Sequence, residues 1–276
     1  MRKYASRIYL CIIFAILYIP ILTLILFSFN SSASTATFEG FSLDWYRKLF
    51  SNEDAFIALR NTLILAISSS LLSTIIGTAA AEGIYRMKSK WLKTTITSVT
   101  NVPMMNPDIV TGVSFMLFFA AVVGILNIAD YDDIGFFAML IAHTTFCLPY
   151  VILNVLPRIS ELGNSLTEAA LDLGCTPAEA FFKVKLPNIM PGVISGAVMA
   201  FTLSLDDFVI SYFVSPSNFQ TLPLLIYSMT KKTVKPDMYA LSTLIIVTVF
   251  TLLIFSNLKN FKNTDKRKKK TGGRAK

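Results

Sequence analysis

The chain is 276 residues long, 54% of its residues are apolar, and its formal net charge is +8. Only 15% of the residues are charged, compared with about 25% in soluble domains. Several apolar runs exceed the roughly 18–20 residues that are needed to cross the hydrocarbon core of a bilayer. The sequence therefore predicts an all-α, polytopic membrane protein with one membrane domain. Because the basic residues gather beside the apolar runs, the positive charge does not indicate nucleic-acid binding.

Six segments are apolar and long enough to be transmembrane helices. We predict them at residues 8–29, 62–85, 108–128, 134–156, 192–214 and 238–258. The membrane domain then covers 8–258, between a short basic N-terminus at 1–7 and a Lys-rich tail at 259–276 that we expect to be disordered. The first span is not expected to be a signal peptide, because its apolar core has about 20 residues rather than about 7–15.

The distribution of Lys and Arg predicts which side of the membrane each loop faces. Nineteen of the 25 Lys and Arg residues lie in the N-terminus, the 86–93 loop, the loop after the fourth span and the tail. The other three loops carry the remaining six. Because positive charge marks the cytoplasmic side, both termini and the loop after the fourth span are predicted to be cytoplasmic.

The loop after the first span contains a short amphipathic segment, residues 41–50. Its apolar residues have nearly helical spacing, and Trp45 and Tyr46 are residue types that suit the headgroup interface. Packing against the other spans explains the same pattern equally well, so both interpretations stay open.

The second span is rich in small residues, which favours close packing against another helix. Gly77 and Ala81 are four residues apart, as are Ser69 and Ser73, so each pair lies on one helical face. Glu82 falls near the cytoplasmic end of the span, where we expect it to be solvated.

The segment that follows, up to Pro107, is expected to be less regular. Pro107 is predicted to start a new helix with Asn106 as its cap. The fourth span contains the chain's single histidine, His143. We interpret it as a hydrogen-bonding residue between helices, and a role in transport is the alternative.

The three cysteines have no spacing typical of a metal site. They are Cys11, Cys147 and Cys175. Cys11 and Cys147 fall in predicted spans and are interpreted as small, buried apolar residues.

A polar interruption between the fourth and fifth spans predicts two short helices with start signals of their own. Capping boxes are predicted for Ser165 with Glu168 and for Thr176 with Glu179, and Pro177 fits the first helical position. Gly174 is predicted to end the first helix in a left-handed conformation. The step from Leu186 to Pro187 is predicted to end the second, because the residue before Pro avoids helical dihedrals.

The same stretch resembles the EAA loop of ATP-binding-cassette importer permeases. The residues that carry the resemblance, at the family's spacing, are Glu168-Ala169-Ala170, Gly174 and Val184-Lys185-Leu186-Pro187. The resemblance implies the type I (MetI-like) permease fold, with residues 157–191 as a loop that docks in a cleft of a cytoplasmic ATPase. The residues implied in coupling are Glu168, Ala169, Ala170, Gly174, Leu186 and Pro187.

Two adjacent carboxylates interrupt the fifth span. Asp206 and Asp207 would each cost roughly 2.5–3.5 kcal/mol at the centre of a bilayer, so a specific role is expected. Ser204, Asp207 and Ser211 share one helical stripe, which we expect to line a cavity or a subunit interface. The alternatives are that one Asp caps a broken helix or binds a basic residue of a partner.

The functional interpretation of this stretch is a route for cations. Carboxylates attract ammonium groups, and Phe208 and Tyr212 offer aromatic faces for cation–π contacts. No Lys or Arg is predicted inside the spans. Because Asp207 lies on the polar stripe, we expect Asp207→Asn to lower uptake more than Asp206→Asn.

A closer resemblance is to the second permease of spermidine/putrescine importers. It is carried by residues 202–212 and by Asn106-Pro107-Asp108-Ile109-Val110, and it covers most of the chain apart from the tail and Glu82. The resemblance implies substrate contacts for Asp108 and for Ser204, Asp206, Asp207, Phe208, Ser211 and Tyr212. It also implies a bacterial inner-membrane complex with a second, homologous permease, two ATPase copies that bind ATP and Mg, and an extracytoplasmic binding protein.

Other functions stay open at the level of sequence. The chain has no G-x-x-x-x-G-K-[ST] loop, so we do not expect it to be an ATPase, to be an enzyme or to bind a cofactor itself. An importer for iron, thiamine or a phosphonate is the main alternative within this class. An ATP-independent channel or carrier would need no EAA loop, and a membrane scaffold would leave the two aspartates unexplained.

Overall fold

The computed structural model describes residues 2–32, 37–51, 53–127, 130–230, 239–244, 246–247 and 250–251. The chain forms two compact units, one of Met1–Ala55 with Ile226–Lys276 and one of Phe56–Leu225. Among the described residues, five helices are long and apolar enough to cross a membrane, and they correspond to the first five predicted spans. The predicted sixth span lies mostly, and the Lys-rich tail entirely, outside the described residues.

The first unit shows what the two aromatic residues of the 41–50 segment contact. It includes α1 (Arg2–Phe27) and α2 (Asp44–Phe50). Trp45 Nε1 donates to the backbone oxygen of Asn30 at 2.6 Å, and the Tyr46 hydroxyl lies 2.7 Å from the Ser28 hydroxyl. Both rings are therefore held against the residues that follow α1, which favours the packing interpretation of Trp45 and Tyr46.

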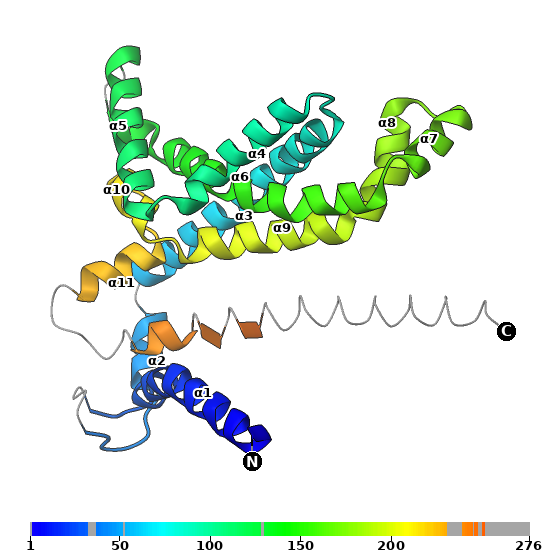
Figure 1. Cartoon of the computed structure of the whole chain (residues 1–276). Coiled ribbons are helices and arrows are strands. Elements are labelled where there is room, and N and C mark those ends of the chain that lie inside the picture. The colour runs from blue at the N-terminus through cyan, green and yellow to red at the C-terminus, as the bar shows by residue number, and fades with distance from the viewer. Residues whose placement is uncertain are drawn as a thin grey trace. The chain divides into compact units, whose positions relative to one another are not determined.

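The second unit is a helical assembly in which α6 and α9 lie side by side (Figure 1). Its helices, of which α3 begins and α11 ends in the first unit, are α3 (Glu53–Arg86), α4 (Lys90–Met105), α5 (Asp108–Leu126), α6 (Gly135–Leu162), α7 (Ser165–Asp172), α8 (Pro177–Glu179), α9 (Leu186–Asp206), α10 (Val209–Val214) and α11 (Leu222–Thr230). A 3₁₀ turn, Tyr131–Asp133, precedes α6, and a π-helix, Ala180–Lys185, follows α8. Figure 1 shows α7 and α8 at one end of the α6–α9 pair and α5 with α10 at the other.

Small residues allow α3, α6 and α9 to approach closely, as predicted. A Cβ atom at Gly77 of α3 would lie 2.7 Å from Cγ1 of Val151 in α6, and one at Gly196 of α9 would lie 3.2 Å from the Cα of the same valine. Ala81 and Ser73 are fully buried. The packing faces of these helices therefore exclude even one additional methyl group at Gly77 unless the backbone moves.

The expectation that Glu82 is solvated is wrong. Glu82 is 8% exposed and its carboxylate is paired with Lys185. The reason is that the π-helix passes beside the end of α3 and covers the carboxylate.

The segment before Pro107 is more regular than expected, because it forms α4. Ser89 caps this helix, and its Oγ accepts a hydrogen bond from the Leu92 N–H at 3.4 Å. Asn106 ends α4 in an extended conformation (ψ 142°), and Pro107 is the N-cap of α5. The prediction that Asn106 is the N-cap of the helix after it is wrong by one residue. Pro107 has a non-helical ψ of 136°, and its carbonyl oxygen accepts a hydrogen bond from the Val110 N–H at 2.9 Å.

The local signals in the polar interruption are mostly confirmed. Gly174 has a φ of +88° after α7. The Thr176–Glu179 capping box is present, with Glu179 N–H donating to Thr176 Oγ1 at 3.3 Å and Thr176 N–H donating to Glu179 Oε2 at 3.0 Å. The capping box predicted at Ser165 is wrong, because Asn164 is the N-cap there and makes no side-chain cap bond.

The prediction that Leu186 and Pro187 end the second short helix is wrong. Lys185 and Leu186 keep helical dihedrals (φ −70° and −56°). Pro187 falls in the first turn of α9, where its missing N–H costs little. The π-helix connects α8 directly to α9. Helical structure therefore runs from Pro177 to Asp206.

Candidate functional site

The predicted fifth span is broken at its paired carboxylates. α9 ends at Asp206 and α10 begins at Val209, with Asp207 in an extended conformation (φ −64°, ψ 121°). Asp207 Oδ1 accepts a hydrogen bond from the Ile210 N–H at 3.2 Å, and Oδ2 accepts one from the Ser211 N–H at 2.8 Å. Asp207 thus satisfies the backbone donors of two fully buried residues in the first turn of α10.

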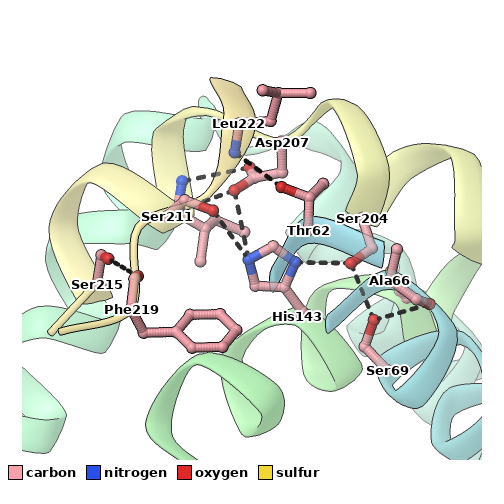
Figure 2. A network of polar contacts seen from close by, with 12 residues as sticks. Thr62, Ala66, Ser69, His143, Ser204, Asp207, Ser211, Ser215, Phe219 and Leu222 are labelled. Carbon is pink, nitrogen blue, oxygen red and sulfur yellow. Dashed lines mark hydrogen bonds and ion pairs between the residues drawn. The ribbon is translucent and has the colours of Figure 1, made fainter. Parts of the chain in front are cut away.

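His143 connects the two sides of this break (Figure 2). Its Nδ1 lies 2.9 Å from the Ser204 hydroxyl at the end of α9, and its Nε2 lies 3.3 Å from the Ser211 hydroxyl and 3.5 Å from Asp207 Oδ2. Ser69 of α3 donates to Ser204 at 2.9 Å. The single histidine therefore joins four helices, as a hydrogen-bonding role predicts.

The polar stripe exists, but it is enclosed. Ser204, Asp207 and Ser211 meet around the His143 ring (Figure 2), and Ser204 and Ser211 are at most 2% exposed. The Asp207 side chain is 7% exposed. The expectation that these three side chains line a cavity is therefore wrong for Ser204 and Ser211, because the imidazole and the break in the helix cover them.

Asp206 has the opposite environment to its neighbour, since it is exposed. It is the last residue of α9, where the negative end of the helix dipole and unpaired carbonyl oxygens gather. Phe208 and Tyr212 follow Asp206 in the chain, and the centres of their rings lie 5.6 Å apart. Tyr212 is 46% exposed. A carboxylate, carbonyl oxygens and aromatic faces together favour a cation.

Asp108 lies at the same end of α6 as Asp206. It is exposed in the first turn of α5, which packs against α10. Gly112, one turn further along α5, lies against Val209 and Phe213 of α10. The two exposed carboxylates are far apart in the sequence, yet they lie at the end of α9 and at the start of α5, which packs on α10.

The residues expected to couple to an ATPase lie at the other end of α6 and α9. The exposed ones are Glu168, Ala169, Gly174 and Pro187. Leu186 is half-buried, and Ala170 is 6% exposed because α7 packs against the π-helix. The sequence did not single out Leu173, which is 86% exposed at the tip of this helix pair. An apolar side chain so exposed beside a polar loop suits a protein contact.

Comparison with known proteins agrees with this arrangement. Residues 73–262 match the family model described as the binding-protein-dependent transport system inner membrane component. The chain belongs to this family. The chain is also similar to the spermidine/putrescine transport system permease protein PotC of Haemophilus influenzae, which is 37% identical over 95% of this chain and 98% of that protein.

Two further relatives are from Escherichia coli. The PotC permease of strain K12 is 39% identical over 89% of this chain and 90% of its own length. The putrescine transport system permease protein PotI is 39% identical over 84% of this chain and 82% of its own length.

Solved structures of the same fold confirm the predicted type I permease architecture. A bacterial ABC transporter involved in the import of the acidic polysaccharide alginate superposes with a TM-score of 0.77, at 18% identity, over 94% of this chain and 95% of that chain. The inward-facing MetNI methionine ABC transporter gives a TM-score of 0.57, at 19% identity, over 75% of this chain and 96% of that chain.

Proposed function

We propose that this chain is one permease subunit of an ATP-driven importer for polyamines such as spermidine and putrescine. The observation that carries the proposal is the exposed Asp206 carboxylate at the C-terminus of α9, between the apolar residues of α9 and those of α10. The names of the relatives at 37–39% identity support the substrate class.

The chemistry of the site suits a chain of ammonium groups. Each ammonium must lose water in a narrow route, and this loss is costly unless a negative group replaces the water. Asp206 and Asp108 supply that charge, while Tyr212 offers an aromatic face. Two carboxylates that do not enclose the ammonium group bind it weakly enough for release.

The proposed partners follow from the two ends of the fold. A second, similar permease completes the route beside α5 and α10. Two copies of an ATPase, which bind ATP and Mg, dock at α7 and α8 through Leu173 and its neighbours. A binding protein delivers the polyamine on the outer side of a bacterial inner membrane, and both termini of this chain are cytoplasmic.

The charge of the site also separates the proposal from its alternatives. A phosphonate is an anion, so Asp206 and Asp108 would repel it along the route. Ferric iron and thiamine are cations, and competition experiments distinguish them from polyamines.

The test is uptake of labelled spermidine by vesicles that contain the complete complex and its binding protein. Asp206→Asn keeps the size of the side chain and removes its charge, so the uptake rate should fall about tenfold, or about 1.4 kcal/mol in the barrier. Asp206→Glu is the matched control and should keep most of the rate. Unlabelled putrescine should compete, whereas thiamine and ferric citrate should not. Wild-type uptake by Asp206→Asn at equal permease abundance would contradict the proposed route.

A further inference from the structure

Lys185 is a fully buried lysine outside the site described above. It ends the π-helix and is 2% exposed. Its Nζ lies 2.9 Å from Oε1 and 2.8 Å from Oε2 of Glu82, a residue 103 positions away in α3. The same ammonium lies 4.7 Å from the centre of the Tyr85 ring, one turn further along α3.

The carboxylate of Glu82 is shared with a second cation. Arg86 Nε donates to Glu82 Oε1 at 2.6 Å, but the Arg86 side chain is 55% exposed and belongs to the same helix. Lys185 is therefore the partner that connects another element to α3. Arg86 lies on the solvent side of the pair and makes a contact only within α3.

The position of the pair explains why an ionic contact matters here. A buried ion pair contributes little net stability, because apolar residues of similar volume stabilise a protein equally well. In some proteins, however, buried polar or ionic groups specify how elements are arranged against one another. Lys185 lies between α8 and α9, and a second polar contact, Ser69 with Ser204, joins the opposite end of α9 to α3.

We propose that Glu82 and Lys185 are a positioning pair that makes α3 move together with the coupling helices α7 and α8 and with α9. α7 packs on the π-helix that carries Lys185. A displacement of α7 by an ATPase therefore reaches α3 through the ion pair and reaches Asp206 through α9. This inference rests on the ATP-driven part of the proposed function and assigns a role to two residues that contact neither substrate nor ATPase.

The experiment measures spermidine uptake and ATP hydrolysis in the same vesicles that contain the complete complex. The apolar pair Glu82→Leu with Lys185→Met removes the ionic contact without leaving an unpaired charge. Its ratio of uptake to ATP hydrolysis should fall about fivefold or more, at normal permease abundance. The reversed pair, Glu82→Lys with Lys185→Glu in an Arg86→Gln background, should recover most of the ratio. Arg86→Gln alone is the matched control and should keep the wild-type ratio.

The outcomes separate the inference from the proposed function. If the wild-type complex shows no spermidine-stimulated ATP hydrolysis, the proposed function fails before the variants are compared. If the wild type is stimulated and the apolar pair keeps its ratio, the positioning role is wrong. A reversed pair whose ratio is no higher than that of the apolar pair also contradicts it. If the variant with the apolar pair does not assemble, the reversed pair alone tests the positioning role. A wild-type ratio of uptake to ATP hydrolysis in the reversed pair supports that role, and a low ratio at normal permease abundance contradicts it.

Discussion

Asp207 accepts a hydrogen bond from the backbone N–H of Ser211 at 2.8 Å, across the break between α9 and α10. Its neighbour Asp206 is exposed at the end of α9. Two adjacent carboxylates therefore have different surroundings. Asp207 stabilises the start of a helix, whereas the carboxylate of Asp206 is free of that role and exposed.

The first prediction concerns this difference. Asp207→Asn keeps one accepting oxygen but loses one of the two backbone hydrogen bonds, so it should destabilise the permease less than Asp207→Ala does and lower uptake less than Asp206→Asn does. Asp207→Ala removes both backbone hydrogen bonds and should destabilise the folded permease by about 1 kcal/mol. Thermal unfolding of the purified permease and uptake at matched abundance are the two measurements.

This order reverses the one expected from the sequence. That expectation assumed a continuous helix with Asp207 on an open stripe. If Asp207→Asn proves as stable as the wild type and yet loses more uptake than Asp206→Asn, the buried carboxylate acts through its charge and the capping role is insufficient.

The second prediction concerns His143. His143→Leu leaves the hydroxyls of Ser204 and Ser211 without the imidazole in a buried site, which should cost about 1–3 kcal/mol of stability. The loss should appear as a lower thermal midpoint and as less permease in the membrane. In the triple variant with Ser204→Ala and Ser211→Ala the unpaired hydroxyls are gone, so much of the stability should return. Normal stability of His143→Leu would contradict the bridging role.

Local signals in the sequence predicted local structure well. The capping box of Thr176 with Glu179 and the left-handed Gly174 involve residues at most a few positions apart, so their chemistry is visible in the chain itself. The first four spans and the small residues around Gly77 were likewise predictable from composition and spacing, whereas the fifth, predicted at 192–214, is broken after Asp206.

Features that join distant residues could not be predicted in the same way. The sequence offered a capping role for one Asp only as an alternative, since nothing local shows that Ile210 and Ser211 lose their helical partners. The pairing of Glu82 with Lys185 depends on a π-helix that places residues 103 positions apart in contact. Charge and hydropathy alone predicted that the Glu82 side chain is solvated.

The third prediction is topological. Ser165 is exposed at the start of α7, and nineteen of the 25 Lys and Arg residues lie on the side predicted to be cytoplasmic. In a variant without native cysteines, Ser165→Cys should resist an impermeant thiol reagent in intact cells and react after the membrane is opened. Labelling of Ser165→Cys in intact cells would show that the topology is the reverse of the predicted one and that α7 and α8 do not face a cytoplasmic ATPase.

The last prediction separates docking from folding in the α7–α8 pair. Leu173 is 86% exposed, whereas Ala170 is 6% exposed against the π-helix. Leu173→Glu should therefore leave the permease stable and reduce its binding of the ATPase, because a charge would be buried in the contact. Ala170→Leu should instead lower the abundance of the folded permease, because the added atoms have no room.

Gly174 cannot make this distinction by itself. Its φ of +88° strains any other residue there, so Gly174→Glu would change the backbone and the docking surface together.

The measurements for Leu173→Glu and Ala170→Leu are co-purification of the ATPase and substrate-stimulated ATP hydrolysis, each at matched permease abundance. Normal stimulation in Leu173→Glu would show that the ATPase contacts another surface. Leu173→Met is the conservative control, since it keeps an apolar side chain of similar volume and should behave as the wild type.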